Sequence, residues 1–124
     1  MGGNNTFSSN KVTAFRWRTI EKIHGVKVLK IIDGKDKLPE EAHNSRMYIR
    51  LDNHDKFYQL RIYDSHHITR FELAYHREPA LDPSGKPVLH YHVFSPPGFN
   101  HGPAHLATET MRNKFHKYFK GLDI

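Results

Sequence analysis

A long run of alternating side chains constrains this chain more than any other feature. Between Arg46 and Phe94, apolar and polar residues alternate with a period of two, which is typical of half-buried β-strands. Short segments rich in Asp, Asn, His, Pro and Gly interrupt the pattern, and such segments form turns. The sequence therefore predicts a meander of four antiparallel strands, at 46–51, 56–63, 68–76 and 88–94.

Two further apolar segments precede the meander. They predict strands near 12–18 and at 25–32, with a break at His24-Gly25. The polar segment 33–45 that follows is expected to be a loop with one helical turn after Pro39.

The chain after the meander changes to helical spacing. Prolines in 95–103 prevent a strand from continuing, because they lack an N–H donor. A helix is expected over 103–120, with Pro103 in its first turn and an apolar stripe of Met111, Phe115, Tyr118 and Phe119. The predicted fold class is α+β: an antiparallel β-meander of five or six strands with the C-terminal helix packed on one face.

Length and composition bound the protein class. The 124 residues suit one domain, which we place at 11–124 after a disordered N-terminal tail at 1–10. The absence of Cys excludes a disulfide scaffold, a thiolate zinc site and a Cys nucleophile. No apolar run reaches the length of a membrane span and the first residues contain no signal-peptide core, so we expect a cytoplasmic location and no membrane partner.

The charge balance points to an anionic partner. Nineteen Lys and Arg against thirteen Asp and Glu give a net charge of +6, and eleven His can add to it at lower pH. RNA is the partner we expect if this charge gathers on one face.

The two faces of the predicted sheet differ in composition. The helix is expected to cover the face with Ile49, Leu60 and Leu73, which by the same alternation also holds Tyr58 and Val93. If it does, the opposite face remains open to solvent. Arg, Tyr and His dominate that open face, which carries Arg46, Tyr48, Arg50, Gln59, Arg61, Tyr63, Arg70, Glu72, His76, His90 and His92. A register shift of one residue would turn all of them inward.

His90-Tyr91-His92 is the sharpest local motif on this face. Residues two apart on a strand point the same way, and a hairpin closed by 77–87 would bring His76 beside them. Phosphodiester transesterification needs a base for the 2′-OH proton and an acid for the leaving oxygen, and histidine suits both roles at neutral pH. We predict His90 and His92 as the acid/base pair, with His76 as an orienting or third catalytic group.

The remaining polar residues of the face receive supporting roles. Arg61 and Arg70 would stabilise the phosphorane, while Tyr63 and Glu72 would orient the catalytic groups. The predicted substrate-binding residues are Arg46, Arg50, Tyr48, His66 and His67.

The same histidines support a second chemistry. Two or three imidazoles with a carboxylate can bind Zn²⁺ or another divalent transition metal and leave a position for water. The leading interpretation has no cofactor, and this alternative places a metal on His76, His90 and His92. The sequence contains no P-loop, GxGxxG, GxSxG, HExxH or zinc-finger spacing, which argues against the enzyme classes that use them.

The segment Arg61-Ile62-Tyr63-Asp64-Ser65-His66-His67, followed by His90 and His92, resembles the TumE-like group of small histidine-rich toxins from bacterial toxin–antitoxin pairs. The resemblance covers roughly residues 58 to 92. Proteins of that group have an Arg-Tyr-Asp segment and a His-rich stretch on a small β-meander. Their His cluster closely follows the Asp, whereas here 25 residues separate His67 from the end of the HxH motif. The resemblance implies ribonuclease activity and an inhibitory antitoxin protein as partner.

The leading hypothesis is therefore a small basic endoribonuclease of toxin type that uses histidine acid/base chemistry without a metal. One alternative is a His-rich metal-binding hydrolase. Another is a non-enzymatic module whose Arg/Tyr/His face binds nucleic acid or an acidic protein. The sequence leaves open whether the chain forms a homodimer.

Overall fold

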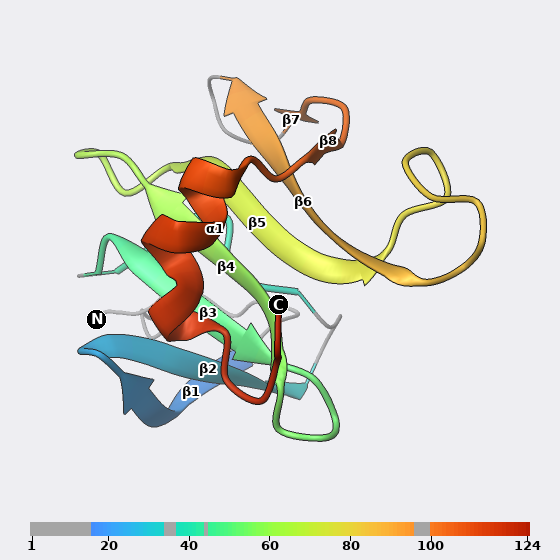
Figure 1. The fold of residues 1–124 in the computed structure, drawn as a ribbon. Helices are drawn as coiled ribbons and strands as arrows, with labels where there is room; N and C mark the ends of the chain where they lie inside the picture. The colour runs from blue at the N-terminus through green and yellow to red at the C-terminus, as the bar shows by residue number, and fades with distance from the viewer. Residues whose placement is uncertain (1–15, 34–36, 44, 96–99) are drawn as a thin grey trace.

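A computed structural model describes residues 16–33, 37–43, 45–95 and 100–124 of the chain (Figure 1). The predicted tail at 1–10 and the first part of the predicted strand at 12–18 lie outside these ranges. The elements in chain order are β1 (Arg16–Ile23), β2 (Val26–Asp33), β3 (Met47–Leu51), β4 (Phe57–Tyr63), β5 (Thr69–Arg77), β6 (Pro87–Ser95), β7 (Asn100–His101), β8 (His105–Leu106), α1 (Glu109–Phe115) and the 3-10 helix η1 (His116–Tyr118).

The strands form one mixed sheet whose spatial order follows the chain from β1 to β7, while β8 also pairs with β6. The antiparallel meander is confirmed for β3 to β6. The expected total of five or six strands is wrong, because the described residues form eight. A fully antiparallel sheet is also wrong, since β2 and β3 pair in parallel. The connection between these two strands, about a dozen residues long, allows such a crossover.

The expected break between the first two strands is confirmed. His24 and Gly25 have φ values of 48° and 82°, the left-handed pair that a two-residue hairpin turn requires. β1 and β2 therefore form a tight antiparallel ribbon at one edge of the sheet.

The C-terminal helix begins later than predicted. His105 and Leu106 pair with Tyr91 and His90 as strand β8, so the chain cannot be helical from Pro103. Thr108 provides the start of α1, because its hydroxyl accepts a 3.1 Å hydrogen bond from the Met111 amide. The prediction of a helix over 103–120 is wrong in extent, although its type and its place after the meander are confirmed.

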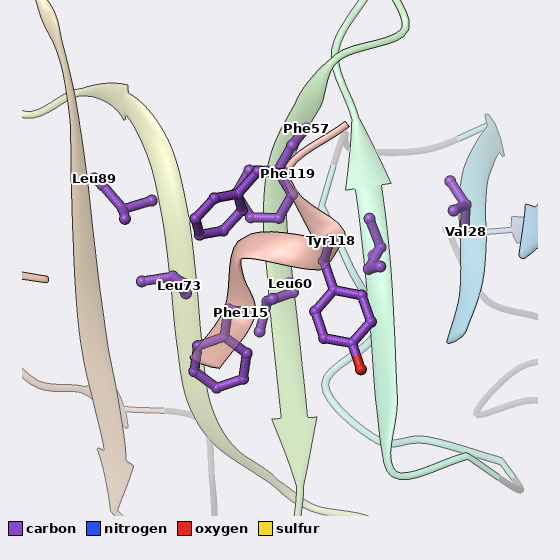
Figure 2. Close-up of a cluster of buried hydrophobic side chains, with 9 residues drawn as sticks. Val28, Phe57, Leu60, Leu73, Leu89, Phe115, Tyr118 and Phe119 are labelled. Atoms are coloured by element: carbon purple, nitrogen blue, oxygen red, sulfur yellow. The ribbon is translucent and has the colours of Figure 1, made fainter. Parts of the chain in front are cut away.

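The helical segment covers one face of the sheet and builds the main core (Figure 2). The apolar stripe packs as predicted, with Phe115, Tyr118 and Phe119 buried and Met111 partly buried against them. The sheet contributes Val28, Ile49, Phe57, Leu60, Leu73 and Leu89.

Two expected members of this core lie elsewhere. Val93 is 54% exposed. In β4 the pairing moves from Gln59 opposite Arg50 to Phe57 opposite Leu51, so Tyr58 is an extra residue at a β-bulge. The bulge places Phe57 in the core and lets the Tyr58 ring stack on His76 at 5.0 Å, on the opposite face.

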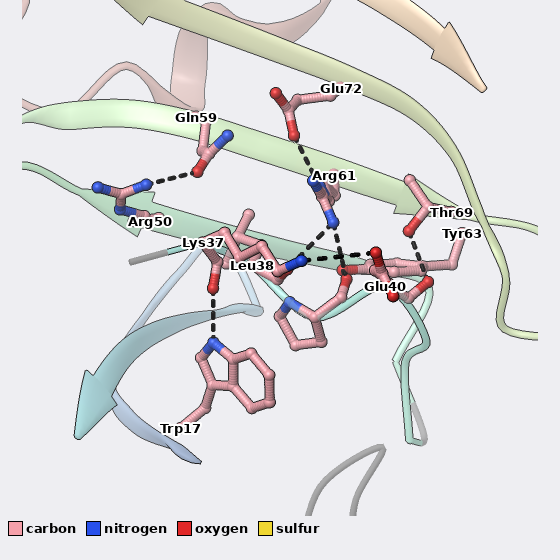
Figure 3. A network of polar contacts seen from close by, with 11 residues as sticks. Trp17, Lys37, Leu38, Glu40, Arg50, Gln59, Arg61, Tyr63, Thr69 and Glu72 are labelled. Atoms are coloured by element: carbon pink, nitrogen blue, oxygen red, sulfur yellow. Dashed lines mark hydrogen bonds and ion pairs between the residues drawn. The ribbon is translucent and has the colours of Figure 1, made fainter. Parts of the chain in front are cut away.

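That opposite face is not open over β3 and β4. The segment 37–43 lies across it and builds a second core with β2, β3 and β4, formed by Leu29, Leu38, Ala42, Tyr48 and Tyr63 with Trp17 packed alongside. Trp17 donates a hydrogen bond from Nε1 to the Lys37 carbonyl (Figure 3). Glu41 forms a β-bridge with Ile68, where one helical turn was expected. The predicted solvent exposure of Tyr48, Gln59, Arg61, Tyr63 and Glu72 is therefore wrong. It is also wrong for His90 on β6, which is fully buried.

Among the described residues, no helix has the length and apolar character needed to cross a membrane.

Candidate metal centre

His90 and His92 lie on β6 and point to the face opposite α1, as the alternation predicts. Their cross-strand partners on β5 are Ala74 and Glu72, respectively. Ala74 is fully buried and has only a methyl side chain, so the strand next to His90 leaves room for an imidazole ring.

The His90 side chain is fixed in one tautomer. Its Nδ1 atom lies 2.8 Å from the Val88 carbonyl, which can only accept, so Nδ1 carries the proton and Nε2 carries a lone pair. The side chain is fully buried, and Nε2 has no hydrogen-bond partner among the described residues. Burial lowers the pKa of His90, and the neighbouring imidazoles of His76 and His92 act in the same direction. His90 therefore presents a buried, unprotonated nitrogen that none of the described residues contacts through a hydrogen bond.

His92 has the same arrangement. Its Nδ1 atom lies 2.9 Å from the carbonyl of Gly102, in the segment that returns along β6, so its Nε2 also carries the lone pair. The Gly102 amide donates a 2.7 Å hydrogen bond to the Val93 carbonyl, which fixes the acceptor on the strand.

Glu78 completes a group of three ligands. It directly follows β5, and its backbone carbonyl accepts hydrogen bonds from the amides of Leu81 and Asp82, which fold the loop back at this point. The ligand atoms of Glu78, His90 and His92 all lie within 4.8 Å of one another. Two imidazoles and a carboxylate form a donor set that zinc and non-haem iron sites use.

Sequence reasoning missed Glu78. It lies in a segment that composition identifies as a turn, and the return of that segment toward β6 is a tertiary feature. One feature of the sequence could have indicated Glu78. It lies two residues after His76, at the start of the loop 77–87 that joins the strand of His76 to the strand of His90.

Two further imidazoles flank the three ligands. The His76 ring lies 4.7 Å from the His90 ring, and the His101 ring lies 4.7 Å from the His92 ring. Both also have Nδ1 at a backbone carbonyl, that of Arg77 for His76 and that of Gly102 for His101. The structure thus brings His76 into contact with His90 as predicted, but the third member of the closest ligand group is Glu78.

Arg61, Tyr63 and Glu72 hold the segment 37–43 onto the sheet (Figure 3). Arg61 donates from Nε to Glu72 at 2.6 Å, and from Nη1 to the carbonyls of Leu38 and Pro39 at 3.0 and 3.2 Å. The Tyr63 hydroxyl donates to the Pro39 carbonyl at 2.6 Å, and burial raises the pKa of this phenol. These groups form hydrogen bonds with one another and with the segment 37–43. A phosphate-binding site would require them to face solvent, and they do not.

Arg70, predicted to stabilise the phosphorane, and the first two predicted substrate-binding residues, Arg46 and Arg50, also have partners within the fold. Arg70 forms an ion pair with Asp64 at 2.9 Å, and Arg46 donates to the Tyr63 carbonyl. Arg50 donates to Gln59 and lies over the Tyr58 ring.

The last of these predicted residues are Tyr48, His66 and His67. The buried Tyr48 hydroxyl accepts from the His43 amide. His66 and His67 lie in the turn before β5, whereas Glu78 follows the end of that strand. The structure does not bring these two histidines to His90.

Comparisons with models of protein families, with curated proteins and with solved structures give no match. The resemblance to TumE-like toxins therefore stays a prediction.

Proposed function

We propose that this protein binds a divalent transition metal ion through Glu78, His90 and His92 and functions as a metal-dependent hydrolase. The observation that carries the proposal is the buried His90 side chain: its Nε2 has no partner among the described residues, and one of its ring nitrogens lies within 4.8 Å of ligand atoms of the other two residues.

The energetics of burial favour this interpretation. A buried polar atom without a partner costs about 1–3 kcal/mol, and a metal ion would supply the missing partner. Metal ligands of the histidine type commonly donate their second ring nitrogen to a backbone carbonyl, as both His90 and His92 do. Ligands at about 2.1 Å around a tetrahedral ion lie about 3.4 Å apart. The three ligand atoms here lie within 4.8 Å of one another, so small adjustments of the side chains would be enough to reach that geometry.

The number of ligands favours hydrolysis over a purely structural role. Catalytic zinc sites use three protein ligands and keep a position for water, whose pKa the metal lowers toward 7. Glu78, His90 and His92 match that number. In this arrangement the protein supplies two oriented imidazoles and one charge-balancing carboxylate, while a bound metal supplies the activated water.

The metal-independent ribonuclease is less well supported by the same geometry. A general acid or base must reach the proton that it transfers, and the His90 imidazole is fully buried. Its pKa is lowered by burial, which disfavours the protonated form that a general acid needs. Arg61 would also have to leave Glu72 before it could contact a phosphate.

The binding test uses protein freed of metal with EDTA and titrated calorimetrically with Zn²⁺, Mn²⁺ and Ni²⁺. We expect one equivalent of at least one of these ions to bind at micromolar concentration. His90→Ala and Glu78→Gln should each weaken binding at least tenfold. His54→Ala, which removes an exposed turn histidine, is the matched control and should leave binding unchanged. Absence of binding at micromolar metal, or equal loss in the control, would contradict the metal centre.

The activity test compares hydrolysis of RNA and of bis-p-nitrophenyl phosphate with and without EDTA. Loss of cleavage in EDTA, with recovery on adding the metal, is the expected result. Cleavage that persists in EDTA and is lost in His90→Ala/His92→Ala would instead favour the metal-independent ribonuclease.

A further inference from the structure

The imidazoles on the sheet face opposite α1 form a row that runs from solvent into the protein. His101 is exposed, His92 is half-buried and His90 is fully buried. The ring centroids lie 4.7 Å apart between His101 and His92, and 5.5 Å apart between His92 and His90. The row therefore leads from solvent to the buried nitrogen on which the metal centre depends.

Strand pairing places His101 on this face. His101 is the cross-strand partner of Phe94 in the antiparallel β6–β7 pair, and such partners point to the same side of a sheet (Figure 1). Phe94 follows His92 by two residues on β6, so His92 and His101 share one face. A Cβ atom at Gly102 would lie 3.3 Å from the Val93 carbonyl oxygen, which is tighter than ordinary contact. Glycine at this position therefore lets the segment with His101 lie close against β6.

One backbone carbonyl orients both outer imidazoles. Nδ1 of His92 lies 2.9 Å from the Gly102 oxygen and Nδ1 of His101 lies 3.1 Å from it, and the two lone pairs of this oxygen can accept both protons. Both Nε2 atoms then carry lone pairs, and the described residues form no hydrogen bond with either of them. Two neighbouring imidazoles in this tautomer can both act as ligands of a divalent ion.

The other end of the row is covered. The His76 ring lies 4.7 Å from the His90 ring, but the Tyr58 ring stacks on His76 at 5.0 Å. The Arg50 guanidinium lies 4.3 Å from the centroid of the Tyr58 ring and brings a positive charge to this end, which repels an approaching cation. The exposed end at His101 is therefore the favoured entry for a metal ion.

We propose that His101 and His92 form an outer capture position, on which a divalent transition metal ion binds before it moves to the inner ligands Glu78, His90 and His92. Two imidazoles are too few to retain the ion, whereas the inner position offers three ligands. His92 belongs to both positions, so the ion exchanges one ligand at a time and is not released between them. This inference rests on the proposed metal centre, and it assigns His101 a role in uptake and release alone.

A ligand that acts only during transfer changes rates without changing affinity. Because it stabilises the transition state and not the final complex, its removal slows association and dissociation by the same factor. We expect His101→Ala to slow both rates about tenfold, which corresponds to about 1.4 kcal/mol of barrier, and to leave Kd within about twofold of the wild type.

The experiment combines kinetics with an equilibrium measurement. Stopped-flow mixing of metal-free protein with Zn²⁺ and a fluorescent zinc indicator measures association, a chase with excess EDTA measures dissociation, and calorimetry measures Kd. His105→Ala is the matched control, because His105 is an exposed histidine of the same segment. Its cross-strand partner Tyr91 packs against the core under α1, on the other face of the sheet. The control should keep both rates of the wild type.

The outcomes separate this inference from the metal centre itself. Unchanged rates in His101→Ala, or the same slowing in His105→Ala, would overturn the capture role and leave the metal centre standing. A weaker Kd with an unchanged association rate would make His101 a resident ligand, which would also overturn it. Wild-type protein that takes up no Zn²⁺ would overturn the inference too, and the calorimetric titrations with Mn²⁺ and Ni²⁺ would then show whether the metal centre fails with it.

Discussion

Two buried polar clusters lie side by side on one face of the sheet, and they differ in how their polar atoms are satisfied. Glu72 stands opposite His92 in the β5–β6 register, so the two clusters adjoin. In the first, Arg61 donates to Glu72 and to two backbone carbonyls. In the second, His90 uses Nδ1 within the fold and leaves Nε2 without a partner among the described residues.

The comparison teaches how to separate structural from functional polar residues. Arg61, Tyr63 and Glu72 are the residue types that a phosphate-cleaving site uses, yet they bond to one another and to the segment 37–43. Two buried side-chain atoms have no partner among the described residues: Nδ1 of His67, in the turn before β5, and Nε2 of His90, two residues along β6 from the cross-strand partner of Glu72. Under the proposed metal centre, residue type and shared face are weaker guides to function than a buried atom without a partner among the described residues.

The largest expected effect comes from breaking the first cluster. Arg61→Met leaves Glu72 buried without its cation, and breaking a buried pair in this way costs about 3–5 kcal/mol of unfolding free energy. Urea denaturation of the metal-free protein measures the loss. The double variant Arg61→Met/Glu72→Leu should recover part of it, because no charge is then left unpaired. A double variant less stable than the single one would contradict this account of the pair.

The next effect is specific to the second cluster. At a metal concentration of about 100 times Kd, binding to the native state should raise the unfolding free energy by about 2.7 kcal/mol. His90→Ala, with its affinity reduced at least tenfold, should lose at least about half of this increase, whereas Tyr63→Phe should keep it. Thermal unfolding with and without metal makes the comparison. An equal metal response in wild type and His90→Ala would refute the distinction between the clusters.

Tyr63→Phe should also have a smaller effect on the metal-free protein. It removes the hydroxyl that donates to the Pro39 carbonyl, which should cost about 1 kcal/mol. Pro39 still accepts from Arg61, so its carbonyl is not left without a donor. Urea unfolding and metal titration of the same preparation should show a stability loss with unchanged metal affinity. A tenfold change in metal affinity would assign Tyr63 to the metal centre.

The smallest effect concerns Arg70 and Asp64, a more exposed counterpart of the Arg61–Glu72 pair. Arg70→Ala should cost less than about 1 kcal/mol at pH 7, as exposed pairs do. Hydrogen bonds from the amides of Ile68 and His66 and the charge of Arg70 lower the Asp64 pKa below its ordinary value of 3.8. Its contribution to stability is therefore present above pH 3.8 and lost as the pH falls through the folded-state pKa.

Urea midpoints between pH 5 and pH 2.5 measure this acid effect. The wild type should lose more stability over that interval than Asp64→Ala, in which the titrating carboxylate is absent. Parallel pH profiles for the two proteins would contradict the assignment of the shift to Asp64.

Side-chain periodicity was sufficient to predict the meander and to place His90 and His92 on one face. Such a pattern reports which side chains share a face, but it does not report what covers that face. The polar contacts of the cover are made by backbone carbonyls of Leu38, Pro39 and Glu40, which carry no sequence signal. For this reason the sequence could not distinguish a buried Arg61 from an exposed one.

Local departures from regular structure explain the other differences. Tyr58 changes face because a single bulge adds one residue to β4, and periodicity cannot locate a bulge. The helix starts late because His105 and Leu106 pair with β6, a contact between distant parts of the chain. Glu78 joins the candidate site through the return of a loop, which is also a tertiary feature.

The most direct test of the metal centre is two-bond ¹H–¹⁵N correlation NMR of the histidine rings, recorded on metal-free protein and after one equivalent of Zn²⁺. We predict that His90 and His92 hold their proton on Nδ1 before the addition. Their Nε2 resonances should shift on metal binding while Nδ1 stays protonated. His90 protonated on Nε2 in the metal-free protein, or Nε2 resonances that do not respond to Zn²⁺, would contradict the proposed centre.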